Sequence, residues 1–184
     1  MSQRSFRVVN LYWDESKLQT YIDNFLIPVA TGLKNHPALF AWEIINEPEG
    51  IVHSTKADDE PCFDSTILST TGAGWAKKWI PMERILKFIN RQAAAIKDIT
   101  DNSVLVTSSS WSEKSNTDSF GQRNYYTDSC LIKAGGEASG VLDFYQIHTY
   151  YHNTNGQWSN SQPMVNTAGD YQLDKVDINF TNVF

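Results

Sequence analysis

The sequence contains no run of lysine and arginine residues and no long hydrophobic segment. Of its 184 residues, 15 are Lys or Arg and 21 are Asp or Glu, which leaves a net charge of −6. A nucleic-acid-binding protein needs a basic face that displaces counterions from phosphates, so this class is disfavoured. A bilayer-spanning helix needs roughly 20 consecutive apolar residues, and no such run is present. We therefore expect no nucleic-acid partner and no membrane partner.

The N-terminal segment also lacks a recognisable targeting signal. Its first seven residues are Met-Ser-Gln-Arg-Ser-Phe-Arg, which contain no apolar core of the kind that a secretory signal peptide carries. We therefore expect either an intracellular protein or a true N-terminus that lies outside this sequence.

Cysteine is scarce, with only Cys62 and Cys130. No His/Cys cluster surrounds either residue, so a zinc site is not expected. The two thiols are either free or joined in a disulfide, and we favour the disulfide. It would close a loop of about 69 residues and stabilise the fold by roughly 4 kcal/mol in the chain-entropy model. A disulfide would also indicate maturation in an oxidising compartment.

Hydrophobic patterning predicts strands that alternate with helices. Strands are expected at residues 6–13, 39–46, 103–109 and 141–148, with a last possible strand at 175–180. Helices are expected at 17–34, 81–98 and 128–134, although Pro28 should kink or break the first of them. A long polar loop covers 49–75. This order favours a parallel α/β fold, either an open doubly wound sheet or part of a barrel. No Gly-rich turn follows the first strand, which disfavours a dinucleotide-binding domain.

The carboxyl ends of the predicted strands carry polar and aromatic side chains. These ends are Tyr12-Trp13-Asp14-Glu15, Asn46-Glu47-Pro48, Ser110-Trp111 and His148-Thr149-Tyr150-Tyr151. In parallel α/β folds the active site lies at this edge of the sheet. The apolar run at 39–46 predicts a strand with both faces covered, and Glu47 follows it directly. A carboxyl group half shielded from water at such a place suits a general acid.

Residues 36–50, His-Pro-Ala-Leu-Phe-Ala-Trp-Glu-Ile-Ile-Asn-Glu-Pro-Glu-Gly, resemble the fourth barrel strand of glycoside hydrolase family 5. Within that family the match is closer to the animal-type endo-β-1,4-mannanases. Further matching segments are 62–64, 72–76, 111 with 114–118, 130–131 and 144–150. The resemblance runs from about residue 6 to about residue 152, and residues 153–184 form a divergent tail.

This resemblance implies an α/β fold that is a partial (β/α)8 TIM barrel, with about strands three to six or seven and their helices. Residues 1–184 would then form a single incomplete glycoside hydrolase catalytic domain. The resemblance also implies an extracellular protein that cleaves internal β-1,4-mannosidic bonds of mannans by a retaining two-carboxylate mechanism. No cofactor and no metal are expected, and the partner would be a polysaccharide, either mannan or a related β-glycan.

Individual roles follow from the matching positions. Glu47 corresponds to the general acid/base, and Asn46 to the amide that binds the 2-hydroxyl of the sugar. His148 and Tyr150 correspond to a pair that lines the reacting subsite. Trp111 is a candidate platform for a sugar ring, because pyranose C–H faces stack on aromatic side chains.

The second carboxylate of a retaining pair should lie about 5–5.5 Å from the first. Glu43 shares a strand face with Glu47, but four residues at about 3.3 Å each place it about 13 Å away. We expect it to be a structural carboxylate inside the barrel. Glu49 lies just past Pro48, and the resemblance gives it no catalytic role.

The family's nucleophile is a Glu at the end of the seventh strand. This sequence has no Glu after Glu137, and the best local match, 175–180, places Asn179 at that position. An amide cannot form the glycosyl-enzyme intermediate, so we expect impaired hydrolysis. A barrel of eight units needs about 250 residues, which suggests a truncated or alternatively spliced product. The alternatives are a non-catalytic carbohydrate-binding remnant of the same fold and, more remotely, an unrelated open α/β binding domain.

Overall fold

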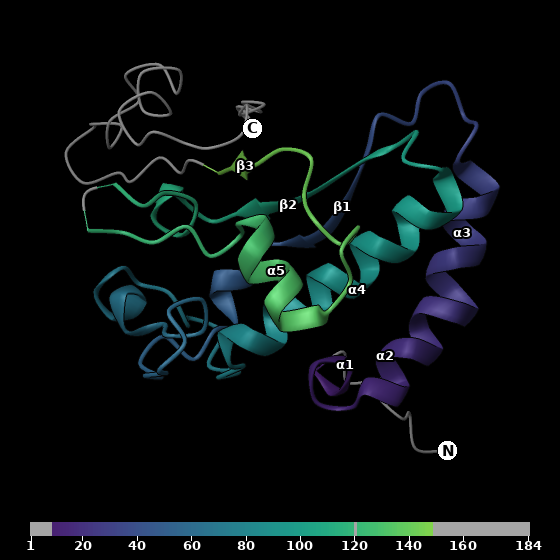
Figure 1. The fold of residues 1–184 in the computed structure, drawn as a ribbon. Helices are drawn as coiled ribbons and strands as arrows, with labels where there is room; N and C mark the ends of the chain where they lie inside the picture. Colours follow the sequence, from purple (N-terminus) through teal and green to yellow (C-terminus); the bar gives the residue numbers. More distant parts are fainter. Residues whose placement is uncertain (1–8, 120, 149–184) are drawn as a thin grey trace.

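The computed structural model describes residues 9–119 and 121–148, and these form a parallel sheet with helices packed against it (Figure 1). The strand order is β1–β2–β3, and both pairs are parallel. The strands are β1 (Ala41–Asn46), β2 (Leu105–Ser110) and β3 (Gln146–Ile147). The α-helices are α1 (Asn10–Trp13), α2 (Glu15–Tyr21), α3 (Ile27–Leu33), α4 (Met82–Thr100) and α5 (Asp128–Gly135). The predicted α/β class is confirmed.

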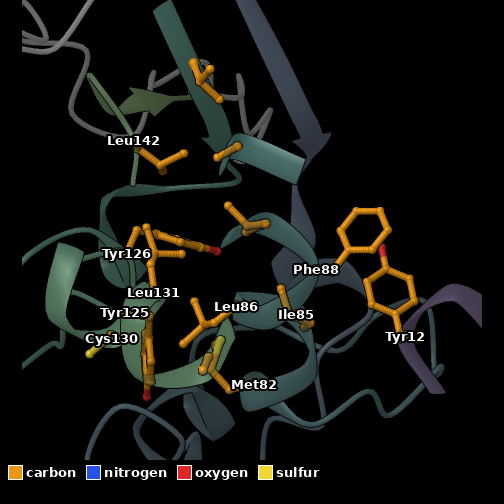
Figure 2. Packing of buried hydrophobic residues seen from close by; sticks show 14 of the residues in the cluster. Tyr12, Met82, Ile85, Leu86, Phe88, Tyr125, Tyr126, Cys130, Leu131 and Leu142 are labelled. Carbon is orange, nitrogen blue, oxygen red and sulfur yellow. The ribbon is translucent and has the colours of Figure 1, made fainter. Parts of the chain in front are cut away.

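Helix α4 connects β1 to β2 and packs against both strands as well as against α3 and α5. It begins after Pro81, which has an extended conformation (ψ 143°) and has no N–H to leave unsatisfied. Apolar side chains recur along it every three or four residues, which places Ile85 and Ile89 in the core without exposed surface. Figure 2 shows Tyr12 against Phe88 to one side of this helix and Tyr126, Leu131 and Leu86 to the other. The predicted helix at 81–98 is therefore confirmed.

The predicted strand at residues 6–13 is wrong where the structure describes it, because Asn10–Trp13 form the helix α1. Asp14 then begins α2, since its side chain accepts hydrogen bonds from the N–H groups of Ser16 and Lys17. Packing on α4 also favours the helix: the Tyr12 ring lies 4.5 Å from that of Phe88. These contacts outweigh the local strand propensity, and the segment Tyr12–Glu15 is not a strand end.

The predicted helix at residues 17–34 is confirmed, with a local change that accommodates Pro28. A π-helical turn at Ile22–Leu26 separates α2 from α3, and Pro28 lies in the first turn of α3. Proline cannot donate a hydrogen bond, and its ring crowds the preceding turn of an α-helix. A wider turn just before it relieves this crowding, so the chain stays helical past Pro28.

The strand predicted at 141–148 is shorter than expected, because β3 contains only Gln146 and Ile147. Upstream of it, Asp143 takes the place of a strand partner. Its N–H donates to the carbonyl oxygen of Val106 over 2.8 Å, and its carboxylate accepts from the N–H of Val106 over 2.7 Å. A side chain therefore replaces part of the regular ladder. The short helix predicted at 128–134 is confirmed as α5.

Several predictions lie outside the described residues: the strand at 175–180 with Asn179, the tail 153–184, and Tyr150. Within residues 9–119 and 121–148, none of the helices is long and apolar enough to cross a membrane.

Candidate active site

The three strands end next to one another, and main-chain hydrogen bonds join their ends. The N–H of Glu47, the residue after β1, donates to the carbonyl oxygen of Ser109 over 2.8 Å. The N–H of His148, the residue after β3, donates to the carbonyl oxygen of Ser110 over 2.9 Å. Trp111 follows Ser110 directly at the end of β2. The structure therefore brings the predicted residues Glu47, Trp111 and His148 to one edge of the sheet.

Glu47 and His148 contact each other although 101 positions separate them in the chain. A hydrogen bond of 2.8 Å joins Glu47 Oε1 to His148 Nδ1, and each side chain is 15% exposed. Glu47 also has left-handed backbone angles, φ 48° and ψ 59°. A non-glycine residue rarely adopts this conformation, and such residues cluster at functional sites. The pair thus presents a carboxyl and an imidazole that are partly shielded from water and fixed in orientation.

Asn46 is exposed at the end of β1 and pairs in register with Ser109. Its amide is therefore accessible beside Glu47. The Ser109 hydroxyl on β2 donates a hydrogen bond to the Glu43 carboxylate on β1. Glu43 is exposed among the described residues and has this hydroxyl as a partner; its place inside a barrel stays a prediction.

Trp111 lies beside a second tryptophan, Trp75, from the long loop after β1. Their ring centroids are 5.2 Å apart and their planes are inclined by 55°. Trp75 is 46% exposed and Trp111 is partly buried, so both rings present apolar surface to solvent. The ammonium group of Lys114 lies 5.5 Å from the Trp111 centroid. Two inclined indoles and a cation near one strand end form a surface on which an apolar sugar face could stack.

Glu49 is buried, with 2% of its surface exposed, and accepts three hydrogen bonds. Its Oε2 accepts from the N–H of Trp111 over 3.0 Å, and its Oε1 accepts from the hydroxyls of Ser115 and Tyr126, each over 2.6 Å. Burial and, next, the charge of Glu49 raise the pKa of Tyr126 well above its usual value. The phenol therefore stays protonated and remains a donor.

The sequence did not single out Glu49 or Trp75 as site residues. Glu49 lies in a polar loop, where a carboxylate is usually solvated, and its donors come from positions more than 60 residues away. Trp75 appeared only as part of the matching segment 72–76. The sequence feature related to the position of Trp75 is Gly50, where an added Cβ would lie 2.7 Å from the Trp75 ring. The glycine allows this close contact.

The long loop predicted at 49–75 is held in place by contacts with α5. A disulfide joins Cys62 to Cys130, so the favoured alternative for the two cysteines is confirmed. Beside it, Lys133 forms an ion pair with Glu60, and the hydrogen bond from Lys133 is the main cause that lowers the Glu60 pKa. The loop therefore has a defined position next to the strand ends.

Comparisons with known proteins agree on one group of relatives. A mannan endo-1,4-beta-mannosidase from Cryptopygus antarcticus is 49% identical over 161 residues, which are 88% of this chain and 41% of that protein. The structure of an endo-1,4-beta-mannanase from Eisenia fetida matches with a TM-score of 0.83 and 51% identity, over 91% of this chain and 45% of that chain. No family model matches.

A third relative, the beta-mannanase of the blue mussel Mytilus edulis, matches with a TM-score of 0.87 and 42% identity, over 99% of this chain and 51% of that chain. The chain thus spans about half the length of the relatives that it matches. The described sheet and helices are accordingly part of a (β/α)8 barrel, as the sequence predicted.

Proposed function

We infer that this chain belongs to the family of the mannan endo-1,4-β-mannosidases that it matches, and we propose that its strand ends bind mannan with Glu47 as general acid/base. The observation that carries the proposal is the 2.8 Å hydrogen bond between Glu47 and His148 at the carboxyl edge of the sheet. A carboxyl group that is hydrogen-bonded to an imidazole and partly shielded from water can donate a proton to the glycosidic oxygen. It can later take a proton from the attacking water.

The neighbouring residues would bind the sugar. Asn46 is exposed beside Glu47, and its amide would hydrogen-bond the 2-hydroxyl. His148 would orient the Glu47 carboxyl through its Nδ1 atom, and Tyr150 would line the same subsite. Trp111 would stack on a neighbouring sugar unit. Internal β-1,4-mannosidic bonds would be the substrate, as the names of the matching relatives indicate for those proteins.

A retaining mechanism needs a second carboxylate as nucleophile, and no Glu follows Glu137 in this chain. We therefore propose that residues 1–184 form an incomplete catalytic domain with impaired hydrolysis. The same observation favours a second candidate function, a non-catalytic carbohydrate-binding remnant that keeps Asn46 and Trp111 at the strand ends.

One experiment tests the proposed function and separates it from the second candidate. The 184-residue chain and its Glu47→Gln variant are incubated with galactomannan, and reducing ends and binding in affinity gels are both measured. We expect binding by both proteins. Any turnover should fall by about 10²- to 10⁴-fold in Glu47→Gln, the usual contribution of a general acid/base. Binding with no turnover in either protein would support the second candidate.

Two other outcomes would contradict the proposal. Turnover equal to that of the Cryptopygus antarcticus relative would show that this chain supplies its own nucleophile. Absence of galactomannan binding would remove both carbohydrate functions.

We also propose an extracellular location for this protein. The disulfide between Cys62 and Cys130 supports it, because disulfides persist in oxidising compartments. Titration of free thiols in the native protein tests this point: two reactive thiols after isolation without a reducing agent would contradict it.

A further inference from the structure

The reaction proposed above makes no use of Glu49, although it is the most buried carboxylate near the strand ends. Three donors surround it: the main-chain N–H of Trp111 and the hydroxyls of Ser115 and Tyr126. A buried carboxylate is costly unless hydrogen bonds compensate for its lost hydration, and these three donors do so. The fold therefore supplies three donors to this carboxylate, two residues beyond Glu47.

Glu49 also connects the two tryptophans to the strand that carries Glu47. Its side chain binds the N–H of Trp111, while its carbonyl oxygen accepts from the N–H of Gly74 over 2.8 Å. Gly74 directly precedes Trp75, whose ring lies against Gly50. Glu49 thus contacts the main chain at Trp111 through its side chain and the segment that carries Trp75 through its carbonyl group.

The two indoles form a surface that suits a sugar chain. Their centroids are 5.2 Å apart, their planes are inclined by 55°, and Trp75 is 46% exposed. The apolar C–H face of a pyranose stacks on such rings, while its hydroxyls take polar partners. The cation of Lys114 adds a hydrogen-bond donor near the Trp111 ring.

We propose that Glu49 is a positioning residue, which sets Trp75 and Trp111 as a binding platform for the mannan chain beside Glu47. The identity of the ligand rests on the proposed function, whereas the effect of Glu49 on the two rings does not. A carboxylate suits this role because its two oxygens accept from three donors that come from different segments. An alanine leaves all three donors without this acceptor.

The first test measures the rings directly. Two close, inclined indoles give an exciton couplet in the circular dichroism spectrum, which Trp75→Phe and Trp111→Phe each remove. We expect Glu49→Ala to lose this couplet while the helical signal remains. Glu49→Gln should keep it, because the amide oxygen can still accept from Trp111 while the hydroxyls turn to accept from the amide nitrogen. Glu15→Ala, at an exposed carboxylate on α2, is the matched control and should leave the couplet unchanged.

The second test measures galactomannan binding in affinity gels. Glu49→Ala and Trp111→Ala should each weaken binding about tenfold, the range expected for a lost aromatic contact. In the Trp111→Ala background, Glu49→Ala should have little further effect, since both changes remove the same contact. A merely structural role would give two losses that add.

The outcomes separate this inference from the proposed function. If the couplet and the binding both persist in a folded Glu49→Ala variant, the inference is overturned and the proposed function stands. If the unmodified chain does not bind galactomannan, the proposed function fails, while the couplet still reports on Glu49. Should Glu49→Ala not fold, Glu49→Asp replaces it, because the shorter side chain withdraws the carboxylate from the Trp111 N–H. A retained couplet in Glu49→Asp would count against the inference.

Discussion

Strand β1 is more hydrophobic than its neighbour β2, yet β2 is the more deeply buried of the two. Strand β1 has the sequence Ala-Trp-Glu-Ile-Ile-Asn, and none of its residues is buried. Strand β2 has the sequence Leu-Val-Thr-Ser-Ser-Ser, and five of its six residues are buried. Position in the sheet explains this difference: β2 lies between two strands, whereas β1 pairs with β2 alone among the described residues. Composition alone would predict the reverse.

The hydroxyl groups of β2 tolerate burial because each has an acceptor. Thr107 donates to the carbonyl oxygen of Phe144, and Ser108 to that of Ile45. Ser110 donates to the side-chain oxygen of Asn116 over 2.8 Å. Buried hydroxyls with partners cost little, and they link the central strand to both neighbours and to the loop after it.

Ile44 and Ile45 of β1 line an open hollow of about 470 Å³. Its other lining residues come from α1, α2, α4 and loop segments: Val9, Leu11, Tyr12, Tyr21, Ile51, Lys78, Ile80 and Phe88. Trp42, Ile44 and Ile45 are partly buried and pack against the core, so the expectation that both faces of this strand are covered is met in part among the described residues.

The largest loss of stability is expected where Asp143 supports β2. We expect Asp143→Ala to lower the free energy of unfolding by about 3 kcal/mol, because it leaves the buried Lys97 ammonium unpaired and removes the acceptor of the Val106 N–H. Urea denaturation measures this loss. Asp98→Ala, at an exposed carboxylate on the same helix as Lys97, is the control and should change the value by less than about 0.5 kcal/mol. Equal midpoints for the two variants would contradict the assignment.

The next effect compares one apolar truncation in each strand. Val106 in β2 has no exposed surface, whereas Ile45 in β1 is partly exposed. We expect Val106→Ala to cost about 2 kcal/mol and Ile45→Ala about 1 kcal/mol, although the isoleucine loses more atoms. Thermal unfolding of both variants measures the difference. A larger loss for Ile45→Ala would mean that β1 is covered in solution.

A smaller effect is expected from the serine that joins the two strands. Ser109→Ala removes the hydroxyl that donates to Glu43, and we expect a loss of about 1 kcal/mol. Ser103→Ala is the matched control: this exposed hydroxyl donates to the carbonyl oxygen of Thr100, and its loss should cost less than about 0.5 kcal/mol. If both variants unfold alike in urea, the link between β1 and β2 contributes nothing.

The parts of the fold that the sequence predicted are those with a strong local pattern. The helix over 81–98 has a regular apolar stripe and a proline at its start, and the run at 39–46 matches β1 closely. The strand predicted at 6–13 was wrong in its described part because its β-branched and aromatic residues favour a strand only locally. In the described part, packing of Tyr12 on Phe88 and the cap at Asp14 decide the outcome. The contact between Tyr12 and Phe88 joins residues that are more than 70 positions apart in the chain.

In the candidate site, too, some contacts could be predicted from the sequence and others could not. Parallel strands place their carboxyl ends together, so the meeting of Glu47 and His148 followed from the predicted strand order. The burial of Glu49 did not, because its donors Ser115 and Tyr126 approach only when the chain is folded. No local pattern distinguishes a loop glutamate that is buried from one in solvent. The catalytic and sugar-binding roles of Glu47, Asn46, His148, Tyr150 and Trp111 stay predictions.

The smallest effect is expected beside the open side of β1, at the exposed residue Asp14. Hydrogen bonds with the side chain of Lys17 and then with Ser16 lower the pKa of Asp14. A lowered pKa means that the folded state favours the ionised carboxylate, so Asp14 contributes stability above its unfolded pKa of about 4. That contribution disappears as the pH falls through the folded value. We therefore expect Asp14→Ala to be slightly less stable than the unmodified chain at pH 7, with a difference that shrinks below about pH 4.

Thermal unfolding between neutral and strongly acidic pH measures this difference, with Asp14→Asn as the matched control. Asparagine keeps a cap at the start of α2 but has no charge, so the gap between Asp14→Asn and Asp14→Ala should not depend on pH. Asp14 directly follows helix α1, whose residues Leu11 and Tyr12 line the hollow together with Ile44 and Ile45 of β1. If the pH-dependent loss of stability in Asp14→Ala were larger than the loss in Ser109→Ala, the region beside β1 would contribute as much to the stability of the fold as β2 does.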